Sequence, residues 1–200
     1  NQLMKHRISH TEEGSQLLEQ YLIGHCAPTL ANIKTANLFG YRFASQAELE
    51  RQMEETRQIL SPKGVSVRIL HERGGRALIY VYRRQRLLCD LEADEVRSFL
   101  GGYGYDDFSE EPVLDTLAGR IQNAGGEFPH EIGLFLGYPL GDVKGFIKHK
   151  GQNCKCVGCW KVYCDECEAQ RQFCRFEKCR SIYCRLYREG RGLSRLIVAA

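Results

Sequence analysis

The sequence predicts one mixed domain of the α/β or α+β class, with a small sheet, flanking helices and a Cys-rich C-terminal helix. Two patterns predict this class. Apolar residues recur at helical spacing in several segments, and elsewhere they alternate with other residues on both sides of a Gly-Gly pair. At 200 residues and 43% apolar composition, the chain is long enough to close one core. We expect residues 1–150 to form an α/β core domain and residues 151–200 a Cys-rich basic segment packed on it.

Helical spacing and end signals predict the first two helices. The segment Glu13–Ile23 carries apolar residues at helical spacing, and Gly24 is expected to end this helix and begin a loop. Ser45 and Glu48 form a capping box, because the serine oxygen can accept the amide hydrogen of the residue three positions on. A second helix is therefore expected from this box to the Pro and Gly of Ser61–Gly64.

Alternating residues predict a β-hairpin in the middle of the chain. The two strands are expected over Val65–Ile69 and Ala77–Tyr82, with Glu72–Gly75 as the connection between them. The apolar segment Leu87–Leu91 is expected to add a third strand. Two shorter helices are expected further on, over Ala93–Leu100 and Glu110–Asn123.

A long, distinctive string of residues follows these elements. It runs from Phe128 to Phe146 as FPHEIGLFLGYPLGDVKGF, and other short motifs accompany it, namely His25–Leu30 (HCAPTL), Lys34, Leu38-Phe39 and Trp160–Tyr163 (WKVY). Over about residues 20–185 the chain resembles the domain-of-unknown-function family 3793, a bacterial family found mainly in anaerobes. The resemblance implies membership but no activity. It also implies that Cys179 lies where cysteine is usual, whereas several cysteines before it lie at variable positions.

The cysteines are concentrated near the end of the chain, where eight of the ten fall between Cys154 and Cys184. Two Cys-x2-Cys pairs can each offer two thiolates to one tetrahedral ion, and this predicts a metal site formed by Cys156, Cys159, Cys164 and Cys167. The expected cofactor is zinc or an iron–sulfur cluster. However, an extended Trp160–Tyr163 would hold the two pairs apart, so a closed site requires this connector to bend.

Two other roles for these cysteines stay open. Asp165 would cap a helix that starts near Glu166, which places Cys164 and Cys167 at a positive helix end that favours a redox-active thiolate. Alternatively, the cysteines are reduced and serve as small apolar side chains in the core. The later cysteines at five-residue intervals advance by about 140° per step around a helix, so they cannot share one ion.

An enzyme is the alternative from a different class. A cysteine nucleophile needs a histidine within hydrogen-bond reach and a third group that orients it. Cys26 with His130 and Glu131 would supply such a trio if the fold joined their two segments, and His25 is a further candidate. The competing interpretation is that His25 and His130 are hydrogen-bonded core residues.

The glycines spaced by four from Gly133 to Gly145 do not match a phosphate-binding loop, and close backbone packing explains them equally well.

The basic residues favour an interaction module as the third hypothesis. From Gly151 onward, ten Lys and Arg face five Asp and Glu, whereas the whole chain has a net charge of only +3. An acidic partner is therefore expected at the basic helix, while nucleic acid is not expected because glutamates dilute the positive charge.

No stretch of about 20 apolar residues is present to span a membrane, and the polar start Asn1–His10 does not resemble a signal peptide. We expect a cytoplasmic protein with a small molecule or a metal as its ligand.

Overall fold

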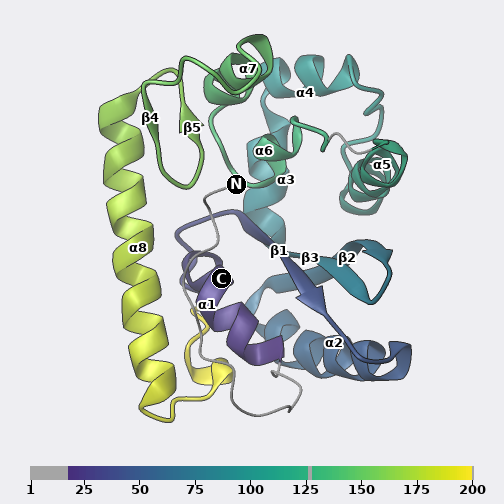
Figure 1. Cartoon of the computed structure of the whole chain (residues 1–200), viewed down its shortest axis with the longest axis vertical. Coiled ribbons are helices and arrows are strands. Elements are labelled where there is room, and N and C mark those ends of the chain that lie inside the picture. The colour runs from purple at the N-terminus through teal and green to yellow at the C-terminus, as the bar shows by residue number, and fades with distance from the viewer. Residues whose placement is uncertain (1–17, 126–127, 200) are drawn as a thin grey trace.

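A three-stranded antiparallel sheet lies at the centre of the molecule, with helices on both of its faces (Figure 1). The computed structural model describes residues 18–125 and 128–199, so the expected helix start at residues 13–17 lies outside the described residues. In the sheet, β3 (Arg76–Arg83) lies between β1 (Ala36–Arg42) and β2 (Val65–Arg73). The small antiparallel sheet and the many helices confirm the expected mixed α+β class.

The hairpin of β2 and β3 is confirmed. Gly74 and Gly75 connect the strands with φ of +58° and +71°, a left-handed conformation that glycine adopts without steric cost. A bulge follows the Ile69–Ile79 pair, because the next paired residue of β2 is His71. The bulge shifts the register by one residue, so His71, Glu72 and Arg73 pair with Leu78, Ala77 and Arg76.

The third strand was predicted in the wrong place. The segment Leu87–Leu91 belongs to α3 (Arg84–Glu92), where Leu87 and Leu91 are four residues apart and both fully buried on one helix face. The third strand is β1 instead. It was missed because both of its faces are covered, with Leu38 packed on one side and Phe39 on the other, so its sequence shows no clear alternation.

The central strand β3 divides the core into two layers. Ala77, Ile79 and Val81 face the cluster around α1 (Leu18–Leu30) and α2 (Gln46–Leu60). Leu78, Tyr80 and Tyr82 face the opposite cluster. That second layer contains α3, α4 (Asp94–Gly101), α5 (Glu110–Asn123), α6 (Ile132–Phe135) and α7 (Leu140–Lys148). Because side chains alternate across a strand, one strand can support both layers.

The helix α1 continues beyond its expected end. It passes through Gly24 and Pro28 to Leu30, so the HCAP motif lies within a helix and not in a loop. Pro28 has no amide hydrogen, which removes only one helical bond. Tertiary packing outweighs this loss, because Cys26 and Ala27 beside it are fully buried against the sheet layer.

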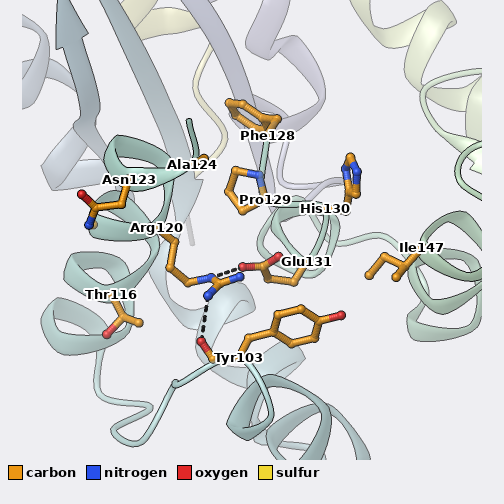
Figure 2. Close-up of a pocket in the computed structure, with 11 residues that line it drawn as sticks. Tyr103, Thr116, Arg120, Asn123, Ala124, Phe128, Pro129, His130, Glu131 and Ile147 are labelled. Atoms are coloured by element: carbon orange, nitrogen blue, oxygen red, sulfur yellow. Dashed lines mark hydrogen bonds and ion pairs between the residues drawn. The ribbon is translucent and has the colours of Figure 1, made fainter. Parts of the chain in front are cut away.

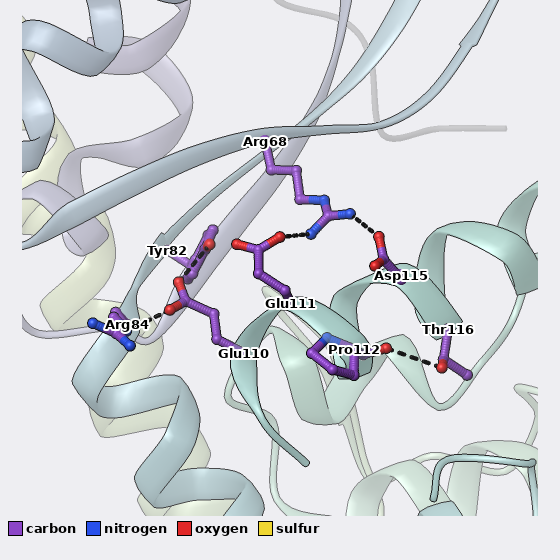
Figure 3. Close-up of polar contacts among 8 residues, drawn as sticks. All are labelled: Arg68, Tyr82, Arg84, Glu110, Glu111, Pro112, Asp115 and Thr116. Carbon is purple, nitrogen blue, oxygen red and sulfur yellow. Dashed lines mark hydrogen bonds and ion pairs between the residues drawn. The ribbon is translucent and has the colours of Figure 1, made fainter. Parts of the chain in front are cut away.

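Caps and ion pairs fix the other helices. Ser45 caps α2 as expected, since its hydroxyl accepts the Glu48 amide hydrogen at 3.3 Å. A polar network joins the start of α5 to the sheet (Figure 3). There Tyr82 donates to Glu110 at 2.8 Å, and Glu110 also pairs with Arg84. Arg68 of β2 pairs with two further carboxylates of α5, those of Glu111 and Asp115.

The last quarter of the chain consists of a small hairpin and a long helix. The cysteine hairpin, residues 154–164, contains β4 (Cys156–Val157) and β5 (Lys161–Val162). The helix α8 (Glu166–Arg188) runs beside it and continues along α1 (Figure 1). Single-turn 3-10 helices lie at Ser61–Lys63 and Leu193–Arg195. None of the helices in the described ranges is long and apolar enough to cross a membrane.

The Cys-rich helix begins where the sequence predicts. Asp165 caps α8 by accepting the Glu168 amide hydrogen at 2.9 Å. The aromatic residues of the helix face the domain. Phe173 and Phe176 pack in a third small core cluster with Trp160, and the later tyrosines pack on the α1 layer. The hairpin and α8 therefore contact the remainder of the molecule through Trp160 and the aromatic residues of the helix.

Candidate functional site

A pocket of about 590 Å³ lies where the end of α5 meets the FPHE motif (Figure 2). Two of the predicted catalytic residues, His130 and Glu131, line it. The other lining groups were not predicted. They include Thr116, Arg120 and Asn123, which lie on one face of α5 because their spacing of four and three residues follows the helical repeat. That spacing is the signal that would have identified them.

A buried ion pair forms the floor of this Arg120 pocket. Glu131 is almost fully buried, and one of its carboxylate oxygens accepts from Arg120 Nε and, at 3.3 Å, from the Tyr105 hydroxyl. Arg120 Nη1 also donates to the Tyr103 carbonyl at 3.0 Å. The bond to Glu131 raises the pKa of Arg120. Burial, followed by the charge of Glu131, raises the pKa of Tyr105, so the phenol stays protonated.

Aromatic and polar side chains form the rim. The Arg120 guanidinium lies 5.2 Å from the centre of the Tyr103 ring, a cation–π distance. His130 is exposed, and its imidazole contacts the Phe146 ring with 4.9 Å between centroids. Phe128, with 42% of its surface exposed, lies beside Pro129, across from Tyr103 (Figure 2). The pocket therefore combines flat apolar surfaces with several hydrogen-bond donors.

The predicted Cys26 site is not assembled. Cys26 is fully buried in the α1 layer, and burial raises the pKa of its thiol. Glu131 lies on the other side of the sheet, where it contacts Tyr105 of the second cluster. The premise that His25 and Cys26 lie in an extended loop was wrong, because both belong to α1. His25 stacks on Phe39, and burial lowers the pKa of this histidine.

The cysteine hairpin is held by one buried carboxylate. Asp142 accepts the Trp160 indole N–H at 2.7 Å and the backbone N–H groups of Tyr163 and Cys164 at 2.8 Å. The helix α7 begins at Leu140, so Asp142 lies in its first turn, and its carboxylate accepts from the hairpin.

The four-residue glycine spacing supports this contact. A Cβ on Gly145 would lie 2.5 Å from the Tyr163 ring, and one on Gly141 would collide with the Cys164 sulfur. The two glycines therefore let the hairpin approach the backbone of α7 closely, as the close-packing interpretation expects.

The predicted metal ligands lie at different places in this segment. Cys159 is in the turn between β4 and β5, Cys156 is in β4, Cys164 follows β5, and Cys167 is in the first turn of α8. In the ranges 18–125 and 128–199, no three His, Cys, Asp or Glu side chains are arranged to hold a metal ion. Thiol donors suit zinc or an iron–sulfur cluster chemically, but this arrangement does not present them together.

Comparison with known proteins adds a family but no activity. The family model described as "Protein of unknown function (DUF3793)" matches residues 22–197. The chain belongs to the DUF3793 family. No curated protein and no solved structure matches it. The matched range extends from α1 to the last 3-10 turn, so it includes both the Arg120 pocket and the cysteine hairpin.

This DUF3793 protein also buries a lysine, Lys34. Lys34 follows α1, and its ammonium donates to the carbonyls of Ala36 and, at 3.0 Å, of Leu136. It also lies 5.2 Å from the Tyr138 ring, whose hydroxyl donates to the Cys159 carbonyl at 3.2 Å. Burial lowers the pKa of Lys34 to about 8. Several motifs that carry the family resemblance thus meet around one lysine.

Proposed function

We propose that the Arg120 pocket binds a small molecule rich in hydrogen-bond acceptors, such as an organic acid with a carboxylate. The relation between Arg120 and Glu131 supports this most directly. Glu131 is the only carboxylate among the described lining residues, and its side chain is 2% exposed, against 34% for Arg120. A ligand that enters therefore meets the guanidinium first, with the neutralising charge beneath it.

The ion pair also orients the guanidinium. An arginine has five N–H donors in a fixed plane, and the contacts of Arg120 with Glu131 and the Tyr103 carbonyl use only part of this set. The remaining donors can bind a carboxylate or a carbonyl. Because the side chain is already fixed, binding requires little ordering, which favours affinity.

The rim suggests the remainder of the ligand. Tyr103, Phe128 and Ile147 offer apolar surface, and His130 and Asn123 offer polar groups at the opening. Pockets for small molecules commonly have such an apolar lining with a few polar groups that set orientation. We infer a ligand with a flat or apolar body and one acidic end.

The test compares benzoate with its neutral isostere benzamide. We expect benzoate to raise the melting temperature of the protein more than benzamide, because both can accept hydrogen bonds from Arg120 but only benzoate brings a negative charge to it. His130→Gln and Arg120→Lys should reduce the benzoate effect, whereas Arg51→Lys on the exposed face of α2 should not. Equal effects of both compounds, or an unchanged response in the Arg120 and His130 variants, would rule out the proposed binding.

A second function, thiol chemistry near the start of α8, is supported by the way this segment is fixed. Asp142 holds the Cys164 amide, and Asp165 caps the helix that carries Cys167. Both cysteines are free and exposed. Partial burial raises the pKa of Cys164, which disfavours its thiolate, so bound metal or disulfide exchange would have to displace this proton. Zinc or an iron–sulfur cluster stays a prediction for this segment.

Metal content and mass spectrometry test this second function. In protein purified without oxygen, about one equivalent of zinc or iron that a Cys164→Ser/Cys167→Ser variant loses and a Cys89→Ser control keeps would support the metal prediction. If the segment is redox-active instead, oxidised glutathione should convert the pair to a disulfide and lower the mass by about 2 Da. If the protein contains no metal after purification without oxygen and forms no disulfide with oxidised glutathione, it lacks the proposed thiol function.

A further inference from the structure

The outer face of α8 carries a narrow row of cations. An α-helix turns by about 100° per residue, so residues spaced by three, four or seven positions lie on the same side of it. The cations on this side form what we call the basic stripe, namely Arg171, Arg175, Lys178 and Arg185, and all four are exposed. Over the whole helix, six Lys and Arg face three glutamates.

Half of the cations in the basic stripe are not neutralised by an ion pair within the described residues. Among the described residues, Arg175 and Lys178 have no ion-pair partner. Arg171 pairs with Glu168 at 3.2 Å and Arg185 with Glu189 at 3.9 Å, but these are exposed pairs between neighbouring turns. Such pairs contribute little and exchange readily for a better partner.

We propose that the basic stripe binds an acidic segment of a partner protein. Charge complementarity supports an anionic partner, and the remainder of the helix indicates its class. Single-stranded nucleic acid would need exposed aromatic rings for base stacking, whereas the aromatic residues of α8, such as Phe173 and Phe176, pack against the domain. A membrane surface would need an apolar face, and Ile182 is the only large hydrophobic residue of α8 with substantial exposure in the described structure.

The dimensions of the stripe suggest a regular partner. The first and last cations, Arg171 and Arg185, are separated by about 21 Å along the axis at 1.5 Å per residue. An acidic helix of about four turns, with glutamates at intervals of three and four residues, would place carboxylates at matching heights. Electrostatic pairing of this kind acts mainly on the rate of association and weakens as salt rises.

The probe is an 18-residue helical peptide with glutamates along one face. We expect it to bind the full chain at low salt. Arg175→Glu/Lys178→Glu should weaken binding at least tenfold, because these two cations lack partners of their own. The control is Arg51→Glu/Arg57→Glu on α2, where the charges of two exposed, ion-paired arginines are reversed, and binding should fall by less than threefold.

Thiol protection localises the contact. Cys174 lies on the same face as the stripe, whereas Cys89 is exposed on α3. Bound peptide should slow alkylation of Cys174 several-fold and leave Cys89 unchanged. The proposal is overturned if the peptide does not bind, if both charge-reversal variants bind it equally, or if Cys174 is not protected. Tighter binding of single-stranded DNA or of anionic vesicles than of the peptide overturns the assigned partner class.

Discussion

The buried carboxylate of Asp142 accepts the indole N–H of Trp160 at 2.7 Å and thereby joins α7 to the cysteine hairpin. Two backbone amides share the same carboxylate, so one side chain satisfies three donors. The Trp160 ring also stacks on Tyr138, which lies beside Lys34. The hairpin, the FLGYPLGD motif and the end of α1 are therefore parts of one packed region.

Replacement of Asp142 should loosen the cysteine hairpin. Asp142→Ala leaves one buried and two partly buried donors without their partner, and we expect a loss of about 2–4 kcal/mol in the free energy of unfolding. Trp160 is the single tryptophan of the chain, so its fluorescence reports on this region alone. Its emission should shift to the red in the variant. An unshifted spectrum together with unchanged stability would show that Asp142 does not hold the hairpin.

The glycine at position 145 should not tolerate a methyl group. Gly145→Ala places a Cβ against the Tyr163 ring, and such overpacking costs about 1–3 kcal/mol. Gly24→Ala in α1 is the matched control, since a Cβ there meets no atom within 4 Å. It should be neutral or stabilise by up to about 1 kcal/mol. Chemical denaturation measures both, and equal effects of the two substitutions would contradict the close contact.

The buried lysine should make stability depend on pH above neutrality. Burial lowers the pKa of Lys34 to about 8 in the folded protein, below the ordinary value of 10.5. As pH rises through 8, the folded form loses a proton that the unfolded chain still binds, so the stability contributed by this group increases up to about pH 10.5. The wild type should therefore gain about 1–2 kcal/mol relative to Lys34→Met between pH 8 and 9.5.

The comparison with Lys34→Met is needed because other groups act in the opposite direction. Burial raises the pKa of the Cys26 thiol, so unfolding exposes a thiol that ionises more readily and stability falls with rising pH. The larger cause of this shift, burial of Cys26, is common to both proteins and cancels in their difference, whereas the smaller effect of the Lys34 charge on Cys26 is lost in Lys34→Met. A difference that stays constant over this pH range would show that Lys34 has an ordinary pKa.

The cysteine of the HCAP motif should be unreactive in the folded state. Cys26 is fully buried, whereas five cysteines in other positions are exposed, namely Cys89, Cys159, Cys164, Cys167 and Cys174. A soluble alkylating reagent should label these five within minutes and Cys26 only after unfolding. Peptide mass mapping identifies the labelled positions. Rapid native labelling of Cys26 would restore the nucleophile hypothesis.

Local signals in the sequence predicted much of the fold. The capping serine of α2, the Gly-Gly turn of the hairpin and the capping aspartate of α8 each act within a few residues, so each could be recognised directly. The prediction failed where burial overrides local preference. The helix α1 passes a glycine and a proline because its residues are buried, and β1 shows no alternation because both its faces are covered.

The site depended still more on tertiary contacts. His130 and Glu131 could be proposed from sequence, but Arg120, 11 residues away on another helix, could not be assigned to the same carboxylate. Cys26 was proposed as a nucleophile, yet its burial in α1 was not visible locally.

The sequence by itself determined the kinds of side chain available, the helix ends and turns, and the concentration of cysteines and cations near the C-terminus. Only the tertiary structure decided which charges are buried and paired, because burial and contact depend on residues brought together from distant parts of the chain. Glu131 beneath Arg120, Asp142 against Trp160 and Lys34 between two carbonyls are consequences of that packing. Each of them carries a free-energy cost or gain that no local pattern of residues can specify.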